Sequence, residues 1–134
     1  MNKTIAVIGS SRRNGNTGKL IDLIAKELNI EVIDLSLKNI SPFDYEHKNT
    51  DDDFLPLMTH LLKHDNIIFV SPVYWFSMSA QMKIFIDRMS DFLSIEELND
   101  KGRELRMEAL FTRIVEMVSI LTLTKMKLII SLKN

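Results

Sequence analysis

Apolar runs and amphipathic stretches alternate along the first two thirds of the chain. The apolar runs are short and nearly continuous, which is typical of strands covered on both faces, and the stretches between them repeat apolar residues at helical spacing. The predicted strands are residues 3–8, 30–35 and 66–70, and the predicted helices are residues 17–28, 51–63 and 79–93. This alternation predicts an α/β fold, a parallel sheet with helices on both faces.

The end of the chain is short for such a fold. Only 41 residues follow position 93, whereas a single strand–helix–strand unit takes about 30 residues or more. The pattern there predicts a helix over 104–119 and strand-like segments over 120–123 and 127–132. We therefore expect an incomplete sheet, with three clear strands plus one C-terminal strand. An unfinished sheet edge is a template for another chain, so we also expect an oligomer.

The loop after the first predicted strand has the composition of an anion-binding site. Glycines and small polar residues fill positions 9–18, just before the first predicted helix. Backbone N–H groups at a helix start carry partial positive charge, so a phosphate binds there readily. The segment matches neither the nucleoside-triphosphate loop nor the dinucleotide fingerprint, because Arg13 and Ser11 stand where those patterns need glycine. A loop that only caps the helix through Asn16 or Thr17 is the alternative.

A second loop, after the third predicted strand, brings aromatic residues to the same edge of the sheet. Residues 74–76 are Tyr, Trp and Phe, and Pro72 stiffens the segment before them. Ligands of parallel sheets bind at the carboxyl ends of the strands, so flat rings here suit a flat heteroaromatic ligand. A hydrophobic seam or a subunit contact explains the same rings equally well. The next helix is expected to be capped by Ser77 or Ser79.

Together the two loops resemble those of the flavodoxin-like NADPH-dependent FMN reductases, including the flavin domain of iron–sulfur flavoproteins. The resemblance rests on Gly-Ser-Ser-Arg-Arg-Asn-Gly-Asn-Thr at residues 9–17 and on Ser-Pro-Val-Tyr-Trp at residues 71–75 with the helix that follows. The placement after the first and third strands agrees with flavodoxin-like order, in which these two strands are neighbours. Two loops far apart in sequence are thus expected to converge on one site.

The resemblance has a clear limit along the chain. It covers residues 4–93, and nothing beyond Arg106 matches the family, whose third flavin loop contains a glycine that this chain lacks after Gly102. We therefore expect one flavodoxin-like domain over residues 1–134, with a divergent tail at 107–134. The tail is either part of a short form of the fold or the product of a frameshift or truncation.

The resemblance implies a flavin enzyme with FMN as its cofactor and NAD(P)H as its reductant, passing electrons to a small-molecule acceptor such as free flavin or a quinone. The residues implied for the phosphate are Ser10, Arg12, Asn14, Asn16 and Thr17. Those implied for the ring and ribityl chain are Pro72, Val73, Tyr74, Trp75 and Phe76. Phe76 departs from the small residue often found at its position. We name no catalytic side chain, because the isoalloxazine ring itself supplies the reactivity.

Composition and charge narrow the function further. The chain has no cysteine, which excludes thiolate-bound metals and the iron–sulfur cluster of one branch of the family. The formal net charge is −1, so nucleic acid and acidic membrane surfaces are not expected as partners. The first residues run directly into a strand pattern and no apolar run reaches the ~20 residues of a membrane span. We expect a cytoplasmic protein.

Two further interpretations stay open beside the enzyme. One is a non-enzymatic electron carrier that holds FMN but takes no hydride from a nicotinamide, and the other is a flavin-free remnant or assembly module. His60 and His64 have a spacing that can bind a metal, with Asp65 adjacent, but no third ligand is evident and a solvated helix face is the simpler explanation. We assign no metal site from the sequence.

Overall fold

The computed structural model describes residues 3–93. Strands and helices alternate in this range, with a small hairpin before the last helix. Their bounds are β1 Thr4–Ile8, α1 Asn16–Leu28, β2 Glu31–Asp34, α2 Phe54–Leu61, β3 Asn66–Val70, β4 Val73–Tyr74, β5 Ser77–Met78 and α3 Ala80–Arg88, with 3₁₀ turns at Leu35–Leu37 and Met89–Leu93. The helix and strands predicted within residues 104–132 lie outside the described residues.

β1 is the central strand of a parallel sheet with the order β2-β1-β3. Ile8 at its end lies opposite Asp34 of β2 and Val70 of β3. The β1 side chains from Ile5 to Ile8 are fully buried, as the apolar run predicts for a strand covered on both faces. The structure confirms the parallel sheet and the neighbouring first and third strands. The loops after β1 and β3 therefore start at the same end of the sheet, its carboxyl edge.

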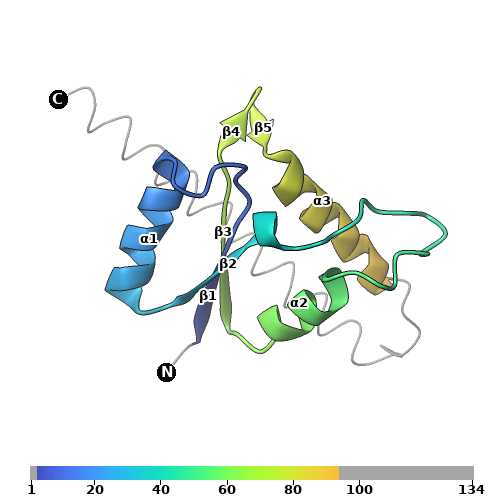
Figure 1. Cartoon of the computed structure of the whole chain (residues 1–134). Coiled ribbons are helices and arrows are strands. Elements are labelled where there is room, and N and C mark those ends of the chain that lie inside the picture. Colours follow the sequence, from blue (N-terminus) through green and yellow to red (C-terminus); the bar gives the residue numbers. More distant parts are fainter. Residues whose placement is uncertain (1–2, 94–134) are drawn as a thin grey trace. The chain divides into compact units, whose positions relative to one another are not determined.

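Helices cover both faces of this sheet: α1 lies on one side, and α2 and α3 lie on the other (Figure 1). Alternate residues of each strand face opposite sides. Ile8 accordingly packs in one cluster with Ile21 of α1. On the other face, the ring of Phe85 in α3 lies 5.6 Å from Phe54 of α2 and 6.0 Å from Phe69 of β3. In residues 3–93, no helix is both long and apolar enough to span a membrane.

Two helices are shorter than the sequence predicts. α2 starts at Phe54 instead of residue 51, because the carboxylate of Asp52 accepts a hydrogen bond from the Phe54 amide at 3.0 Å and ends the preceding turn. α3 ends at Arg88 and continues as a tighter 3₁₀ turn to residue 93. Of the two predicted caps for this helix, Ser79 is the observed one, since its side chain accepts from the Met82 amide at 3.2 Å.

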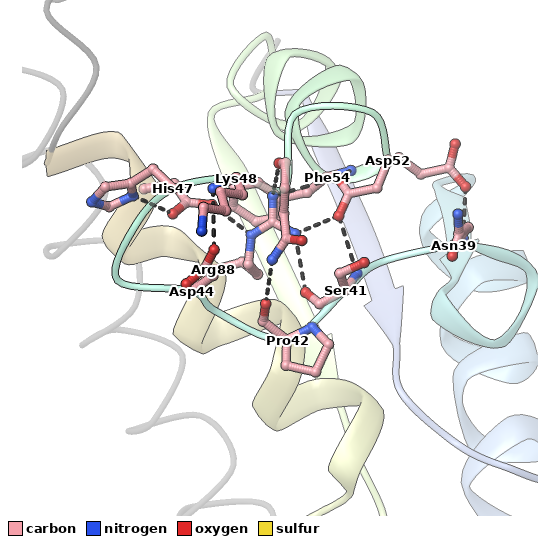
Figure 2. A network of polar contacts seen from close by, with 12 residues as sticks. Asn39, Ser41, Pro42, Asp44, His47, Lys48, Asp52, Phe54 and Arg88 are labelled. Atoms are coloured by element: carbon pink, nitrogen blue, oxygen red, sulfur yellow. Dashed lines mark hydrogen bonds and ion pairs between the residues drawn. The ribbon is translucent and has the colours of Figure 1, made fainter.

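A buried arginine fixes the long connection between β2 and α2. Arg88 is 2% exposed, and its guanidinium donates to the carbonyls of Ser41 and Asn49 and to the carboxylates of Asp52 and Asp91 (Figure 2). These five bonds employ all five N–H donors of the side chain. A buried charge is costly unless it is paired and hydrogen-bonded, and here both conditions are met. The network ties residues 41–52 to the end of α3.

The same network shifts the titration of Asp52. Burial alone raises the pKa of this carboxyl, but hydrogen bonds from Arg88 and from the amides of Ser41 and Phe54 outweigh burial and hold the pKa below its ordinary value. The ionised form of Asp52 is therefore stabilised by folding. The connection before α2 is thus held to the end of α3 by a buried ion pair.

Candidate functional site

The β1–α1 loop is held in shape by its own backbone and by two close approaches. The hydroxyl of buried Ser10 accepts from the Arg12 amide at 3.3 Å and donates to the Arg12 carbonyl at 3.2 Å. A side chain at Gly18 would place its Cβ 1.5 Å from the Arg13 carbonyl oxygen, and one at Gly9 would lie 2.9 Å from the Cβ of Met82. Only glycine fits at these two positions, so the path of the loop depends on them.

The helix that follows this loop begins without a side-chain cap. Gly15 is the N-cap residue of α1, and no side chain accepts a hydrogen bond from the first amides. The alternative prediction, that Asn16 or Thr17 caps the helix, is therefore wrong. The amides at the start of α1 keep their partial positive charge, which is the arrangement that binds a phosphate.

The two arginines of the loop have different partners. Arg13 is engaged by Asp22 of α1, with one bond at 3.1 Å, and its Nε lies 3.7 Å from a carboxylate oxygen of Asp34. The hydrogen bond that Arg13 donates to the Asp22 carboxylate raises the pKa of Arg13 above its ordinary value. Arg12 is exposed and forms no ion pair with any residue between 3 and 93. Arg12 is the loop cation that remains available to an anion.

Two hydrogen bonds fasten the second loop to the first. Ser79, which is fully buried, donates from its hydroxyl to the Gly9 carbonyl. The side-chain amide of Gln81 donates to the Ser11 hydroxyl at 2.9 Å. The Ser71 hydroxyl also accepts from the Ser79 amide at 2.8 Å. Sequence reasoning identified Ser79 as a helix cap but missed its contact with Gly9, which no spacing rule reveals across 70 residues.

The aromatic segment forms a hairpin that the sequence did not predict. Tyr74 pairs with Ser77, so Trp75 and Phe76 are the two residues of the turn. Their φ values are +48° and +63°, the combination of a type I′ turn, where asparagine and glycine are usual. Side chains at positive φ carry strain, of order 1–2 kcal/mol per residue. Trp75 and Phe76 are also 94% and 98% exposed, so no burial explains them.

The predicted site residues thus gather at the carboxyl edge in two groups, near the start of α1 and in the hairpin before α3 (Figure 1). In the first group Ser10 is buried, Thr17 is half-buried, and Arg12, Asn14 and Asn16 are exposed; in the second Pro72 is half-buried, and Val73, Tyr74, Trp75 and Phe76 are exposed. The bonds from Ser79 and Gln81 bring the two loops together. One group offers amides, hydroxyls and a cation, and the other offers planar apolar surface.

A cavity of about 180 Å³ lies elsewhere, beside Arg88 and the loop before α2. It is lined by His47, Asn49, Thr50, Phe54, Leu55, Arg88 and Asp91. Cavities that hold cofactors are usually about 300–1,000 Å³, and the Arg88 donors are all bonded within the chain. We assign no flavin role to this cavity.

Comparisons with known proteins identify the family of the chain. Residues 2–110 match the family model of NADPH-dependent FMN reductase. The chain is 32% identical, over 78% of its length and 61% of the relative's, to a putative NAD(P)H-dependent FMN-containing oxidoreductase of Bacillus subtilis. It is 33% identical, over 65% of its length and 45% of the relative's, to an iron–sulfur flavoprotein of Archaeoglobus fulgidus.

A solved structure also shares the fold. The structure of a Trp repressor binding protein from Bacillus subtilis aligns with a TM-score of 0.55 and 28% identity, covering 73% of this chain and 53% of that one. This likeness confirms the flavodoxin-like architecture expected from the sequence. The chain spans about half the length of the curated relatives it matches. Because the family model matches most of the residues of this chain, the chain belongs to the NADPH-dependent FMN reductase family.

Proposed function

We propose that the chain binds FMN at the carboxyl edge of its sheet and acts as an NAD(P)H-dependent oxidoreductase. The observation that carries the proposal is the junction of the two loops. Ser79 bonds to Gly9 and Gln81 bonds to Ser11, so a polar, cationic loop and an aromatic hairpin belong to one edge. FMN has the matching chemistry, because it joins a phosphate to a planar ring.

The β1–α1 loop fits the phosphate. The first amides of α1 have no side-chain cap, and Arg12 has no ion-pair partner within the described part of the chain. Arg12 and the α1 amides would hold the phosphate charge, and Asn14, Asn16 and Thr17 would donate hydrogen bonds to its oxygens.

The hairpin fits the ring. Strained backbone conformations are concentrated at functional sites, and exposed apolar patches mark surfaces that a ligand or partner covers. The hairpin combines both features. Val73, Tyr74, Trp75 and Phe76 would border the isoalloxazine and ribityl chain, next to Pro72. When bound, FMN supplies hydride and electron-transfer chemistry, and the chain binds and orients it.

Calorimetric titration with FMN and with riboflavin, which lacks the phosphate, tests the phosphate half. We expect the protein to bind FMN more tightly than riboflavin, and Arg12→Ala to lose roughly 10- to 100-fold in FMN affinity, since hydrogen bonds to charged groups are worth about 1.5–3 kcal/mol. Riboflavin affinity should not change. Lys26→Ala removes a like charge at the far end of α1 and is the matched control. Equal FMN losses in the two variants would overturn the assignment.

NAD(P)H oxidation by the FMN-loaded protein, with free flavin or a quinone as acceptor, tests the activity. Oxidation that depends on added acceptor supports the enzyme. Bound FMN without NAD(P)H oxidation would instead support the electron carrier, and a protein that binds no FMN would support the flavin-free remnant. The expected oligomer and cytoplasmic location also remain proposals, checked by light scattering and cell fractionation.

A further inference from the structure

Three potential metal ligands meet at the amino edge of the sheet, the end opposite the flavin loops. Glu31 begins β2, His60 lies in the last turn of α2, and His64 lies in the turn between α2 and β3. One ligand atom from each residue lies within 4.8 Å of the others. No third ligand for the two histidines is evident from sequence spacing, because Glu31 is 29 residues away from His60 and only the fold brings the two together.

The geometry of the group favours metal binding. The Nε2 of His60 lies 3.1 Å from the Oε2 of Glu31. The Nδ1 of His64 lies 3.1 Å from the His60 carbonyl, to which an N–H at this nitrogen donates. Such a backbone bond fixes the tautomer and leaves Nε2 as the nitrogen with a lone pair, as in most histidine metal ligands. The neighbouring Asp65 is a different case, since its carboxylate accepts from the Lys3 amide at 2.7 Å.

We propose that Glu31, His60 and His64 bind a divalent transition metal ion, with zinc as the preferred class. Two imidazoles and one carboxylate are a common zinc ligand set and leave a fourth position for water. Zinc bonds of about 2.0–2.1 Å require ligand atoms roughly 3.3 Å apart. The His60–Glu31 pair is close to this spacing at 3.1 Å, and a ligand atom of His64 lies within 4.8 Å of both partners.

The expected effect of the metal is to join β2 to the α2–β3 turn. Binding to the folded state alone stabilises that state by mass action. Saturating zinc should therefore raise the Tm by roughly 4 °C or more. The site lies at the other end of the strands from the flavin loops, so zinc should leave FMN affinity unchanged.

The test is a zinc titration of the tag-free, full-length chain after removal of metals with a chelator, against a coloured zinc indicator. We expect one zinc ion per chain, and a loss of at least about tenfold in affinity in each of Glu31→Gln, His60→Gln and His64→Gln. His47→Gln is the matched control, because His47 is the third histidine of the chain and pairs with Asp91 instead. An equal loss in His47→Gln, or wild-type affinity in the ligand variants, would overturn the proposal.

A second measurement uses only the wild-type protein, so it tests the site even if a ligand variant does not fold. X-ray absorption at the zinc edge of the wild-type complex should show two imidazole ligands with light oxygen neighbours. A spectrum without imidazole scattering would contradict the site.

Discussion

The two loops of the carboxyl edge are built in opposite ways. The β1–α1 loop is held by internal hydrogen bonds at Ser10 and by glycines at close approaches. The β4–β5 hairpin ends in two aromatic residues at positive φ, both almost fully exposed. The first loop is thus shaped by the fold itself, whereas the second keeps a conformation that the isolated turn disfavours.

Because of this difference, we expect mutations in the two loops to affect protein stability and flavin binding differently. Changes to the glycines of the first loop should harm folding and phosphate binding together, because the same backbone serves both. Changes at the hairpin tip should stabilise the protein and weaken flavin binding, because strain and exposure serve only the ligand. The hydrogen bonds from Ser79 to Gly9 and from Gln81 to Ser11 hold the two loops together.

The Arg88 network gives the largest expected effect on stability. Asp52→Asn should lower the free energy of unfolding at neutral pH by about 3 kcal/mol or more, because it leaves the buried Arg88 without its main partner. The folded-state pKa of Asp52 is lowered, so its contribution is present above about pH 4 and is lost as pH falls through that lowered pKa. Denaturant titrations between pH 7 and pH 3 should show the difference from wild type shrinking in acid. Exposed Asp51→Asn is the control, and a gap that stays constant with pH would refute this account.

At the start of α1, where the helix packs on the first loop, Gly18→Ala should lower the free energy of unfolding by about 2–3 kcal/mol, because the new Cβ would overlap the Arg13 carbonyl. The same substitution should also lower FMN affinity. Gly15→Ala is the milder change for stability, since its Cβ would lie 3.0 Å from the Nε of Arg12 and 3.2 Å from the Arg12 carbonyl oxygen, against 1.5 Å at Gly18. Thermal denaturation and FMN titration of the pair check this. If both alanines were tolerated alike, the loop would not depend on the close approach.

The contact between the two loops at Ser79 gives the next largest expected effect on stability. Ser79→Ala removes both the cap of α3 and the bond to Gly9, which should cost about 1–2 kcal/mol. Ser77→Ala, at the exposed alternative cap, should have little effect. Chemical denaturation measures both. Equal stabilities would mean that Ser79 does not join the loops.

Changes in the hairpin should have the smallest effect on stability, and they should increase it. Replacing Trp75 and Phe76 by Asn and Gly places preferred residues in a type I′ turn, and should raise the free energy of unfolding by about 1 kcal/mol. FMN affinity should fall at the same time. A double variant that loses stability, or binds FMN as the wild type does, would remove the proposed trade-off.

The sequence predicted most of the frame and part of the site. The apolar run predicted burial of residues 5–8 on both faces of the sheet. The sequence also predicted a serine cap for α3 at Ser77 or Ser79, and the structure shows Ser79. The hairpin was missed because Trp-Phe carries no turn signal. Arg88 was missed as a structural centre, since a charged residue gives no sign in sequence that three of its four partners lie 36 to 47 residues away.

Trp75 offers the most direct test of the claim that both loops form one flavin site, because it is the only tryptophan of the chain. FMN added to flavin-free protein should quench its fluorescence to saturation at one FMN per chain. Gly18→Ala, at the start of α1 beside the other loop, should weaken that quenching, while Lys26→Ala, in the last turn of α1, preserves it. FMN binding that leaves Trp75 fluorescence unchanged, or quenching that is the same in Gly18→Ala and Lys26→Ala, would contradict the account.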